Sequence, residues 1–155
     1  MKALITGSFD PITVGHEALI RRAAALFDGI VVLVGVNKAK SGMFPYEERA
    51  QMIRETLADL KDLEVVLWDG LVAEYCAENG ISVIVRGVRG AEDLAYETQM
   101  ARINAEFCPG LETVLLPAAP ELSHISSSLV RELVSFGRSP GKYVSDPVLS
   151  RLAKR

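Results

Sequence analysis

Five short runs of β-favouring, mostly apolar residues alternate along the chain with longer segments of helical periodicity, and this alternation constrains the fold more than any other feature. The runs are Lys2–Thr6, Ile30–Val36, Glu64–Trp68, Ser82–Arg86 and Glu112–Leu116. Several are continuously apolar, as strands are when both faces of a parallel sheet are covered. The pattern therefore predicts buried parallel strands.

The segments between these runs carry apolar residues at helical spacing. Helices are expected at His16–Phe27, Glu47–Leu60, Leu71–Asn79, Glu92–Phe107 and Ser126–Phe136, with a short one near Asp146–Leu152. Strands alternating with helices predict an α/β fold, a doubly wound (Rossmann-like) five-stranded parallel sheet with helices on both faces. No repeat, low-complexity tract or linker interrupts the pattern, which predicts a single domain over residues 1–155.

The expected fold also predicts where a ligand binds. In doubly wound sheets ligands lie beyond the carboxyl ends of the strands. The loops after the five predicted strands should therefore hold the site. They begin after Thr6, Val36, Trp68, Arg86 and Leu116.

Charge and composition exclude several classes of function. The 155 residues carry a formal net charge of −3, which argues against sequence-independent binding of nucleic acid. The longest strongly apolar run, Ile30–Val36, is too short to span a membrane. Met1 precedes the first strand so closely that no signal peptide is expected. Cys76 and Cys108 lack ligand spacing and fit a reducing compartment, so the expected location is cytoplasmic.

The loop after the first strand combines glycines, hydroxyl groups and a histidine at the expected start of a helix. Gly7 and Gly15 let the backbone come close to a ligand, and the helix start offers free N–H groups to an anion. His16 in the first turn can donate a ring N–H to phosphate. An ordinary capping loop with an incidental histidine is the alternative, but the position at the ligand edge favours a binding role.

Three further loops place cations and hydroxyl groups at the same edge. Arg86 and Arg89 flank a glycine after the fourth strand, and guanidinium forks suit phosphate oxygens. Ser126–Ser128 open a helix, where hydroxyls and free backbone N–H groups converge. Lys38 and Lys40 lie in the loop after the second strand, where a flexible basic segment suits closure over a phosphate, although loop lysines are usually solvated surface.

These motifs resemble, in order, those of the nucleotidyltransferase superfamily. Gly7–Pro11 followed by Thr13-x-Gly15-His16 is similar to its signature, and Thr in the place of the first His resembles the phosphopantetheine adenylyltransferase family. That family also carries R-G-x-R followed by D-x-x-Y-E, similar to Arg86–Glu97, and I-S-S-S-x-[VI]-[RK], similar to Ile125–Arg131. The resemblance extends from Ala3 to about Leu152. It departs at Leu122, where the family often has Trp, and at Ser8, where it often has Thr.

The resemblance implies a set of site residues. It implies catalytic roles for His16, Lys40, Arg89 and Ser8. It implies ATP contacts by Ser8, Phe9, His16, Gly87, Val88, Arg89, Glu97, Leu122, Ser123, His124, Ile125, Ser126, Ser127 and Ser128. It implies contacts with the acceptor substrate by Ser8, Lys40, Val72, Arg86 and Asn104, although Asn104 could instead serve packing. No residue is expected to ligate a metal.

The resemblance also implies an activity and its partners. The family transfers the adenylyl group of ATP to 4'-phosphopantetheine and produces dephospho-CoA and pyrophosphate, a step of coenzyme A biosynthesis. Magnesium is expected with ATP, held by phosphates and water, because the sequence offers no dedicated carboxylate cluster. A homohexamer is implied by the family alone, and neither nucleic acid nor membrane is expected as a partner.

Two alternatives follow from the same motifs. A nicotinate-mononucleotide adenylyltransferase or a cytidylyltransferase would share the first loop, but Thr13 and the serine-rich last motif argue against both. A non-catalytic sensor would bind ATP and release no pyrophosphate. The full set of His16, Lys40, Arg86 and Arg89 argues against that reading.

Overall fold

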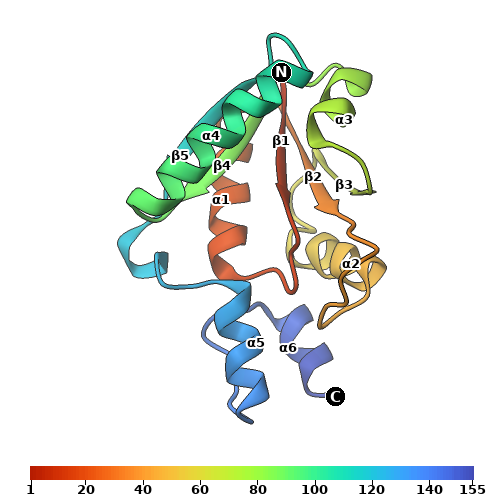
Figure 1. Ribbon diagram of the computed structural model, residues 1–155. Coiled ribbons are helices and arrows are strands. Elements are labelled where there is room, and N and C mark those ends of the chain that lie inside the picture. Colours follow the sequence, from red (N-terminus) through yellow and green to blue (C-terminus); the bar gives the residue numbers. More distant parts are fainter.

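The chain folds around one fully parallel sheet, which the computed structural model describes together with all residues from 1 to 155. The five strands lie in the order β3-β2-β1-β4-β5, with β1 at the centre (Figure 1). Their bounds are β1 Lys2–Gly7, β2 Gly29–Gly35, β3 Leu63–Trp68, β4 Val83–Val88 and β5 Glu112–Pro117. The predicted α/β class and the five predicted strands are confirmed.

Six α-helices connect and cover the strands. They are α1 Val14–Ala24, α2 Tyr46–Thr56, α3 Val72–Asn79, α4 Ala91–Phe107, α5 Ser127–Ser135 and α6 Asp146–Leu152, and a short 3-10 helix spans Pro120–Leu122. No helix is both long and apolar enough to cross a membrane. The helices follow the predicted segments, so the periodicity of the sequence located them correctly.

Two separate cores arise because successive residues of a strand point to opposite faces of the sheet. Ala3 and Ile5 of β1 join the larger core, beneath α1 and α2. Leu4, between them, joins the smaller core, with residues of α3. Both faces of the central strands are therefore buried, which explains why the strands read as continuous apolar runs.

Two helices end earlier than their apolar patterns suggest. α1 ends at Ala24 and α2 at Thr56, whereas periodicity favoured ends at Phe27 and Leu60. Both of these side chains still pack against the larger core, from the turns that follow the helices. Because Phe27 and Leu60 are packed against the core, the apolar pattern continues beyond the last residue of each helix.

The centre of the sheet opens at the carboxyl ends of the strands. β1 pairs with β2 at six positions, from Lys2 to Gly7, but with β4 only at Leu4 and Ile84. The order in which strands are added also reverses here, from the β2 side of β1 to its β4 side. α5 and α6 lie beyond this same end of the sheet (Figure 1). The topology therefore leaves space where ligands of doubly wound sheets bind.

Candidate active site

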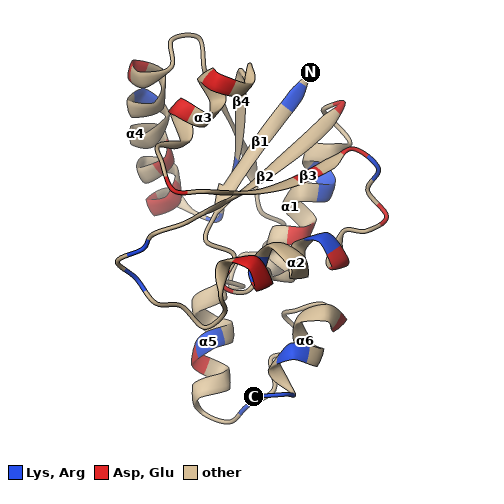
Figure 2. Cartoon of the chain, turned by 90° about the vertical axis from the view of Figure 1, so that its right-hand side faces the viewer, with Lys and Arg blue, Asp and Glu red and all other residues tan.

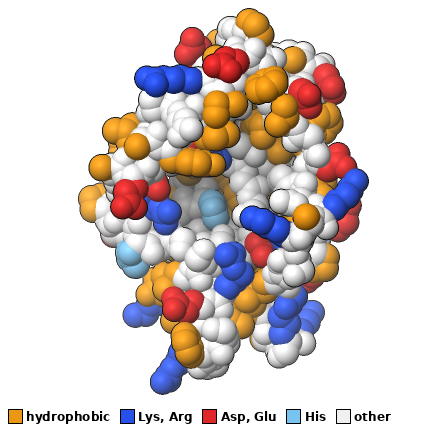
Figure 3. Space-filling view, in the orientation of Figure 1, with side chains coloured by type: hydrophobic (Ala, Val, Ile, Leu, Met, Phe, Trp, Pro, Cys, Tyr) orange, Lys and Arg blue, Asp and Glu red, His pale blue; other side chains and the backbone are white.

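A cavity of about 450 Å³ lies at the carboxyl ends of β1 and β4. It is lined by Thr6–Phe9 of the first loop, by the start of α1, by Arg86, Gly87 and Arg89, and by Ser126 and Ser127. Figure 3 shows the hollow with a histidine side chain on its floor and cations at its rim. The loops predicted from β1, β4 and β5 thus meet at one site.

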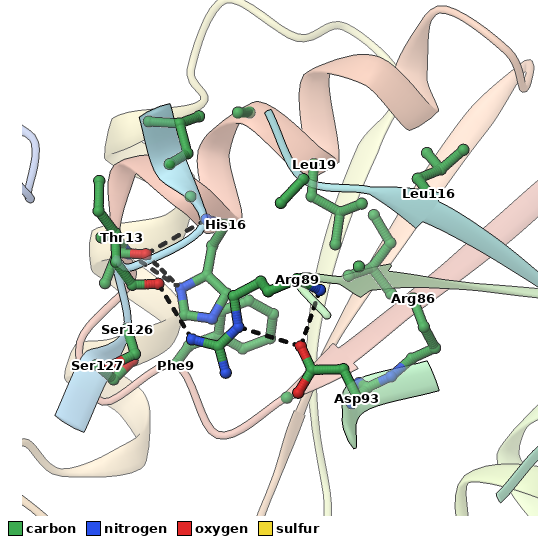
Figure 4. A pocket seen from close by; sticks show the side chains of 18 of the residues that line it. Phe9, Thr13, His16, Leu19, Arg86, Arg89, Asp93, Leu116, Ser126 and Ser127 are labelled. Carbon is green, nitrogen blue, oxygen red and sulfur yellow. Dashed lines mark hydrogen bonds and ion pairs between the residues drawn. The ribbon is translucent and has the colours of Figure 1, made fainter. Parts of the chain in front are cut away.

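The first loop ends in a reciprocal cap that fixes the imidazole of His16 (Figure 4). Thr13 is the N-cap of α1, and its hydroxyl accepts a hydrogen bond from the His16 backbone N–H at 3.3 Å. In return, the Thr13 backbone N–H donates to Nδ1 of His16 at 3.1 Å. Because Nδ1 accepts this bond, the neutral ring carries its proton on Nε2. His16 lines the cavity, so Nε2–H is an available donor there.

The surroundings of His16 also keep the imidazole neutral. Burial, and then the nearby charges of Arg86 and Arg89, lower its pKa to about 4 from the usual value near 6.5. The Phe9 ring, with centroids 4.9 Å apart, covers one side of the imidazole. His16 is therefore a fixed, neutral hydrogen-bond donor at neutral pH.

Arg86 is held rigidly at the end of β4. Its Nε and Nη2 bond both carboxylate oxygens of Glu97, at 3.0 and 2.8 Å. Its Nη1 donates to the Thr6 carbonyl of β1, a group near the point where β1 and β4 cease to pair. Glu97 is 6% exposed, the one buried residue of α4. The pair therefore closes the base of the gap between the strands, and the carboxylate of Glu97 is already engaged by Arg86.

Arg89 is held more loosely, although it lies only three residues further on. Its backbone N–H and its Nε both bond Asp93 Oδ2, at 2.9 and 3.2 Å. Its Nη1 lies 3.5 Å from the Ile125 carbonyl across the cavity, and Figure 4 shows its ion pair with Asp93. The side chain is 45% exposed. Arg89 can therefore turn toward an anion in the cavity.

The serine segment before α5 is fastened directly to the first loop. Ser126 is the N-cap of α5 and accepts from the Leu129 N–H at 3.1 Å. The Ser127 hydroxyl donates to the Pro11 carbonyl at 2.7 Å, and Arg131 donates to the Asp10 carbonyl at 2.7 Å. The starts of α1 and α5 are thus held beside one cavity, and both helix starts favour anions.

The loop between β2 and α2 lies apart from the starts of α1 and α5. It carries two lysines in different environments. It bulges away from the sheet (Figure 2). Lys38 forms an ion pair with Asp69 at 2.7 Å, whereas the ammonium group of Lys40 has no salt-bridge partner in the chain. Lys40 is exposed and does not line the cavity. In this conformation the structure does not bring Lys40 to the other predicted groups.

The remaining predicted residues divide between the cavity and its surroundings. Those that line it are Ser8, Phe9, His16, Arg86, Gly87, Arg89, Glu97, Leu122, Ile125, Ser126 and Ser127. Those that do not are Val88, Ser123, His124, Ser128, Lys40, Val72 and Asn104. Their predicted ligand contacts stay predictions.

Several lining residues were not among the predicted site residues. Arg22 of α1 donates to the Pro117 carbonyl at 2.6 Å and lines the cavity beside Leu116. Asp93 and Tyr96 of α4 also line it. Both belong to the D-x-x-Y-E motif, although no ligand contact was predicted for them. Helical spacing offered one clue, since Arg22, Ala18 and Gly15 follow at intervals of three and four from the first-loop motif. The position of α1 against β5 could not be read from the chain.

Comparison with known proteins places this arrangement in a family. The cytidylyltransferase-like family model matches residues 4–133, so the fold and site define a member of that nucleotidyltransferase class. The phosphopantetheine adenylyltransferase of Cutibacterium acnes is 44% identical over 155 residues, covering 100% of this chain and 98% of the relative. That of Arthrobacter sp. is 46% identical (97% and 95% covered), and that of Caldanaerobacter subterraneus 40% (99% and 96%). The chain belongs to the phosphopantetheine adenylyltransferase family, which confirms the resemblance.

Proposed function

We propose that the protein transfers the adenylyl group of ATP to 4'-phosphopantetheine, producing dephospho-CoA and pyrophosphate. One observation carries the proposal beyond family membership. A neutral histidine with its donor nitrogen fixed shares one cavity with two arginines and the starts of two helices. These are the groups that an in-line transfer between two phosphates requires.

The acceptor phosphate supplies the nucleophile. Its second pKa is about 6, so an oxygen of the phosphate is already ionised at neutral pH. That oxygen forms a bond to the α-phosphorus of ATP as the bond from this phosphorus to the bridging oxygen of pyrophosphate breaks. No proton has to leave the nucleophile. The site matches this need, since His16 accepts a bond at Nδ1 and keeps its proton on Nε2.

The chain's donors then stabilise charge as it develops. His16 Nε2–H donates to the phosphate oxygens in the transition state, and Arg89 and Lys40 neutralise the negative charge that pyrophosphate carries away. Ser8 and Arg86 orient the acceptor phosphate. The start of α5 holds the β- and γ-phosphates with the backbone N–H groups that follow Ser126. Arg86 keeps its fork toward Glu97 and offers its remaining edge to the acceptor.

Magnesium enters with ATP as part of the substrate complex. No group of three or more His, Cys, Asp or Glu side chains in the chain could hold a metal ion, and Asp93 in the cavity is engaged by Arg89. The donor set fits an ion held by triphosphate oxygens and water. Titration of MgCl₂ at constant ATP should restore activity lost to EDTA, with a maximum near one ion per ATP.

The activity is tested by pyrophosphate release from ATP with a panel of acceptors. Phosphopantetheine should support turnover, while nicotinate mononucleotide and glycerol 3-phosphate should not. Pantetheine without its phosphate is the matched control, because its hydroxyl would need a base that the site does not present. Equal rates with pantetheine and phosphopantetheine would contradict the proposal that the ionised acceptor phosphate is the nucleophile. ATP binding without pyrophosphate release would favour the non-catalytic sensor.

Assembly and location are proposed with the activity. We propose a homohexamer, the assembly that the family resemblance implies. Large apolar side chains left exposed on α4, Leu94 at 49% and Phe107 at 58%, support a contact between copies. Light scattering after gel filtration should give six times the chain mass of 16.8 kDa, and a monomeric mass would contradict the assembly alone. A cytoplasmic location follows from the proposed role in coenzyme A biosynthesis and is testable by cell fractionation.

A further inference from the structure

Arg49 of α2 is buried more deeply than any other cation of the chain, yet it does not line the cavity. It is 4% exposed. Its Nε donates to the Phe44 carbonyl at 2.8 Å and lies 3.3 Å from Asp10 Oδ1. Its Nη1 donates to the Ser8 carbonyl at 3.2 Å. One side chain thus bonds both the first loop and the loop between β2 and α2.

Asp10 completes this connection from the opposite direction. It is 5% exposed, and its two carboxylate oxygens accept from the Met43 N–H at 2.8 Å and the Phe44 N–H at 2.9 Å. A buried ion pair gains little net stability, because desolvation offsets the attraction. Removing one partner, however, leaves a buried charge without compensation. A role in holding the two loops together explains the pair better than fold stability does.

Gly42 shows how closely the second loop passes over the pair. A Cβ atom at Gly42 would lie 1.9 Å from Arg49 Nη2 and 2.5 Å from Asp10 Oδ2. Gly42 does not adopt a left-handed backbone conformation. Glycine is therefore required here because no space is left for a side chain. Gly42 lies two residues after Lys40, so the pair fixes the chain immediately beyond this lysine.

The other end of the same loop is fastened separately. The Tyr46 hydroxyl accepts from the Asn37 N–H and donates to the Asn37 carbonyl, each at 3.0 Å. The ring of Tyr46 also lies 4.3 Å from the guanidinium of Arg49. Both ends of the loop are therefore held at the start of α2, while residues 37–42 between them, with Lys40, are exposed.

We propose that Asp10 and Arg49 are positioning residues, which align the loop carrying Lys40 with the first loop so that Lys40 reaches the phosphates of bound ATP. The pair acts through the Met43–Phe44 backbone and contacts no substrate. This inference rests on the proposed function, because it assigns the pair to the same transfer reaction.

The test is a double-mutant cycle between Arg49→Lys and Lys40→Ala, assayed below the melting temperature of each variant. Lysine keeps the charge of Arg49, but its single ammonium nitrogen cannot reproduce the planar fork that bonds the Phe44 and Ser8 carbonyls from two nitrogens. Misplacing a reacting group by about 1 Å can slow turnover about 100-fold. We expect Arg49→Lys to lower kcat about 10- to 100-fold in the wild-type background, with the Kd for ATP changed less than about threefold. In the Lys40→Ala background the same change should lower kcat less than about threefold, because coupled sites are not additive. An equal loss in both backgrounds would overturn the inference.

Two matched controls separate positioning from folding. Arg54 lies on the same helix and donates to the Val65 carbonyl at 2.9 Å, away from both loops, so Arg54→Lys should leave kcat within about twofold. If Arg49→Lys does not fold, Gly42→Ala serves instead, because it crowds the pair from an exposed loop. It should lower kcat at least about fivefold, while Ser41→Ala next to it should not.

A readout without turnover keeps the two proposals apart. Arg49→Lys should accelerate hydrogen exchange at the Met43 and Phe44 amides at least about tenfold, because these amides donate to Asp10. Unchanged exchange, or unchanged kcat in an active enzyme, would overturn the positioning role. A wild-type protein that released no pyrophosphate with any acceptor would instead count against the proposed function.

Discussion

The groups expected to meet the phosphates are held in two different ways on the two sides of the cavity. His16 is fixed by the reciprocal cap with Thr13 and by the Phe9 ring. Lys40 lies at an exposed loop tip, outside the cavity lining. The fixed side loses almost no freedom when ATP binds, whereas the exposed side chain of Lys40 must give up its freedom to contact a phosphate, which opposes binding. Preorganised stabilisation of the transition state should therefore come mainly from His16. Lys40 should contribute only when its side chain reaches the phosphates.

Removing the fixed donor should have the largest effect. We expect His16→Ala to lower kcat about 100- to 1,000-fold, the usual loss when one preorganised donor to developing charge is removed. Steady-state pyrophosphate release measures it, and thermal melting should show a folded protein. His16→Gln, which retains an N–H donor, should lose less. Near-normal turnover in a folded His16→Ala variant would show that His16 does not stabilise the transition state.

The exposed side is tested with two lysines of one loop. We expect Lys40→Ala to lower kcat about 30- to 100-fold, since it removes a charged donor to the phosphates. Lys38→Ala is the matched control and should stay within about twofold, because Lys38 pairs with Asp69 at the surface. Similar losses for both variants would mean that the loop contributes only diffuse positive charge.

The same contrast is repeated on a smaller scale by two arginines. Arg89 is 45% exposed and its guanidinium is held only by Asp93 and a long contact with the Ile125 carbonyl, while Arg86 is fixed by Glu97 and Thr6. We expect Arg89→Ala to lower kcat and raise KM for ATP by about tenfold each, and Arg86→Ala to raise mainly KM for phosphopantetheine, also about tenfold. Wild-type constants for both substrates in both variants would make this loop purely structural.

The smallest expected effect on turnover is that of pH. The pKa of His16 is lowered to about 4 by burial and by Arg86 and Arg89, so kcat should show no titration of this residue between pH 6 and 8. Stability should nevertheless change with pH. The unfolded chain binds the proton below about pH 6.5 and the folded chain only near pH 4, so lowering the pH across this window destabilises the fold. Urea unfolding should show wild type losing about 2 kcal/mol more than His16→Gln between pH 7.5 and 4.5.

The sequence predicted the elements and failed where contacts depend on distant residues. Each strand lies within two residues of its expected bounds, because burial on both faces leaves a continuous apolar run. The loops that follow β1, β4 and β5 were correctly assigned to one edge of the sheet. The partnership of Arg86 with Glu97 could not be read from the chain, because it requires the packing of α4 on β4. Glu97, which was expected to face ATP, lines the cavity and also bonds the arginine that was expected to face the acceptor.

The site residues show the same limit. Arg22 lines the cavity from α1, although no motif marked it as a site residue. Arg49 and Asp10 lie 39 positions apart, so their pairing depends on how two loops cross at the edge of the sheet. Short motifs predicted which loops carry the chemistry, but not how side chains from those loops hold each other.

The fastening of the first loop to the segment before α5 has a consequence for the order in which the molecule is completed. Ser127 and Arg131 bond carbonyls that precede them by 116 and 121 residues, at Pro11 and Asp10. A chain emerging from the ribosome presents its amino-terminal part first. All five strands can therefore be available for pairing while the start of α5, with Ser127 and Arg131, is still missing from the cavity lining and its support. A nascent chain can therefore have formed its whole sheet and still be unable to bind ATP. Nucleotide binding would then indicate that synthesis has continued past α5.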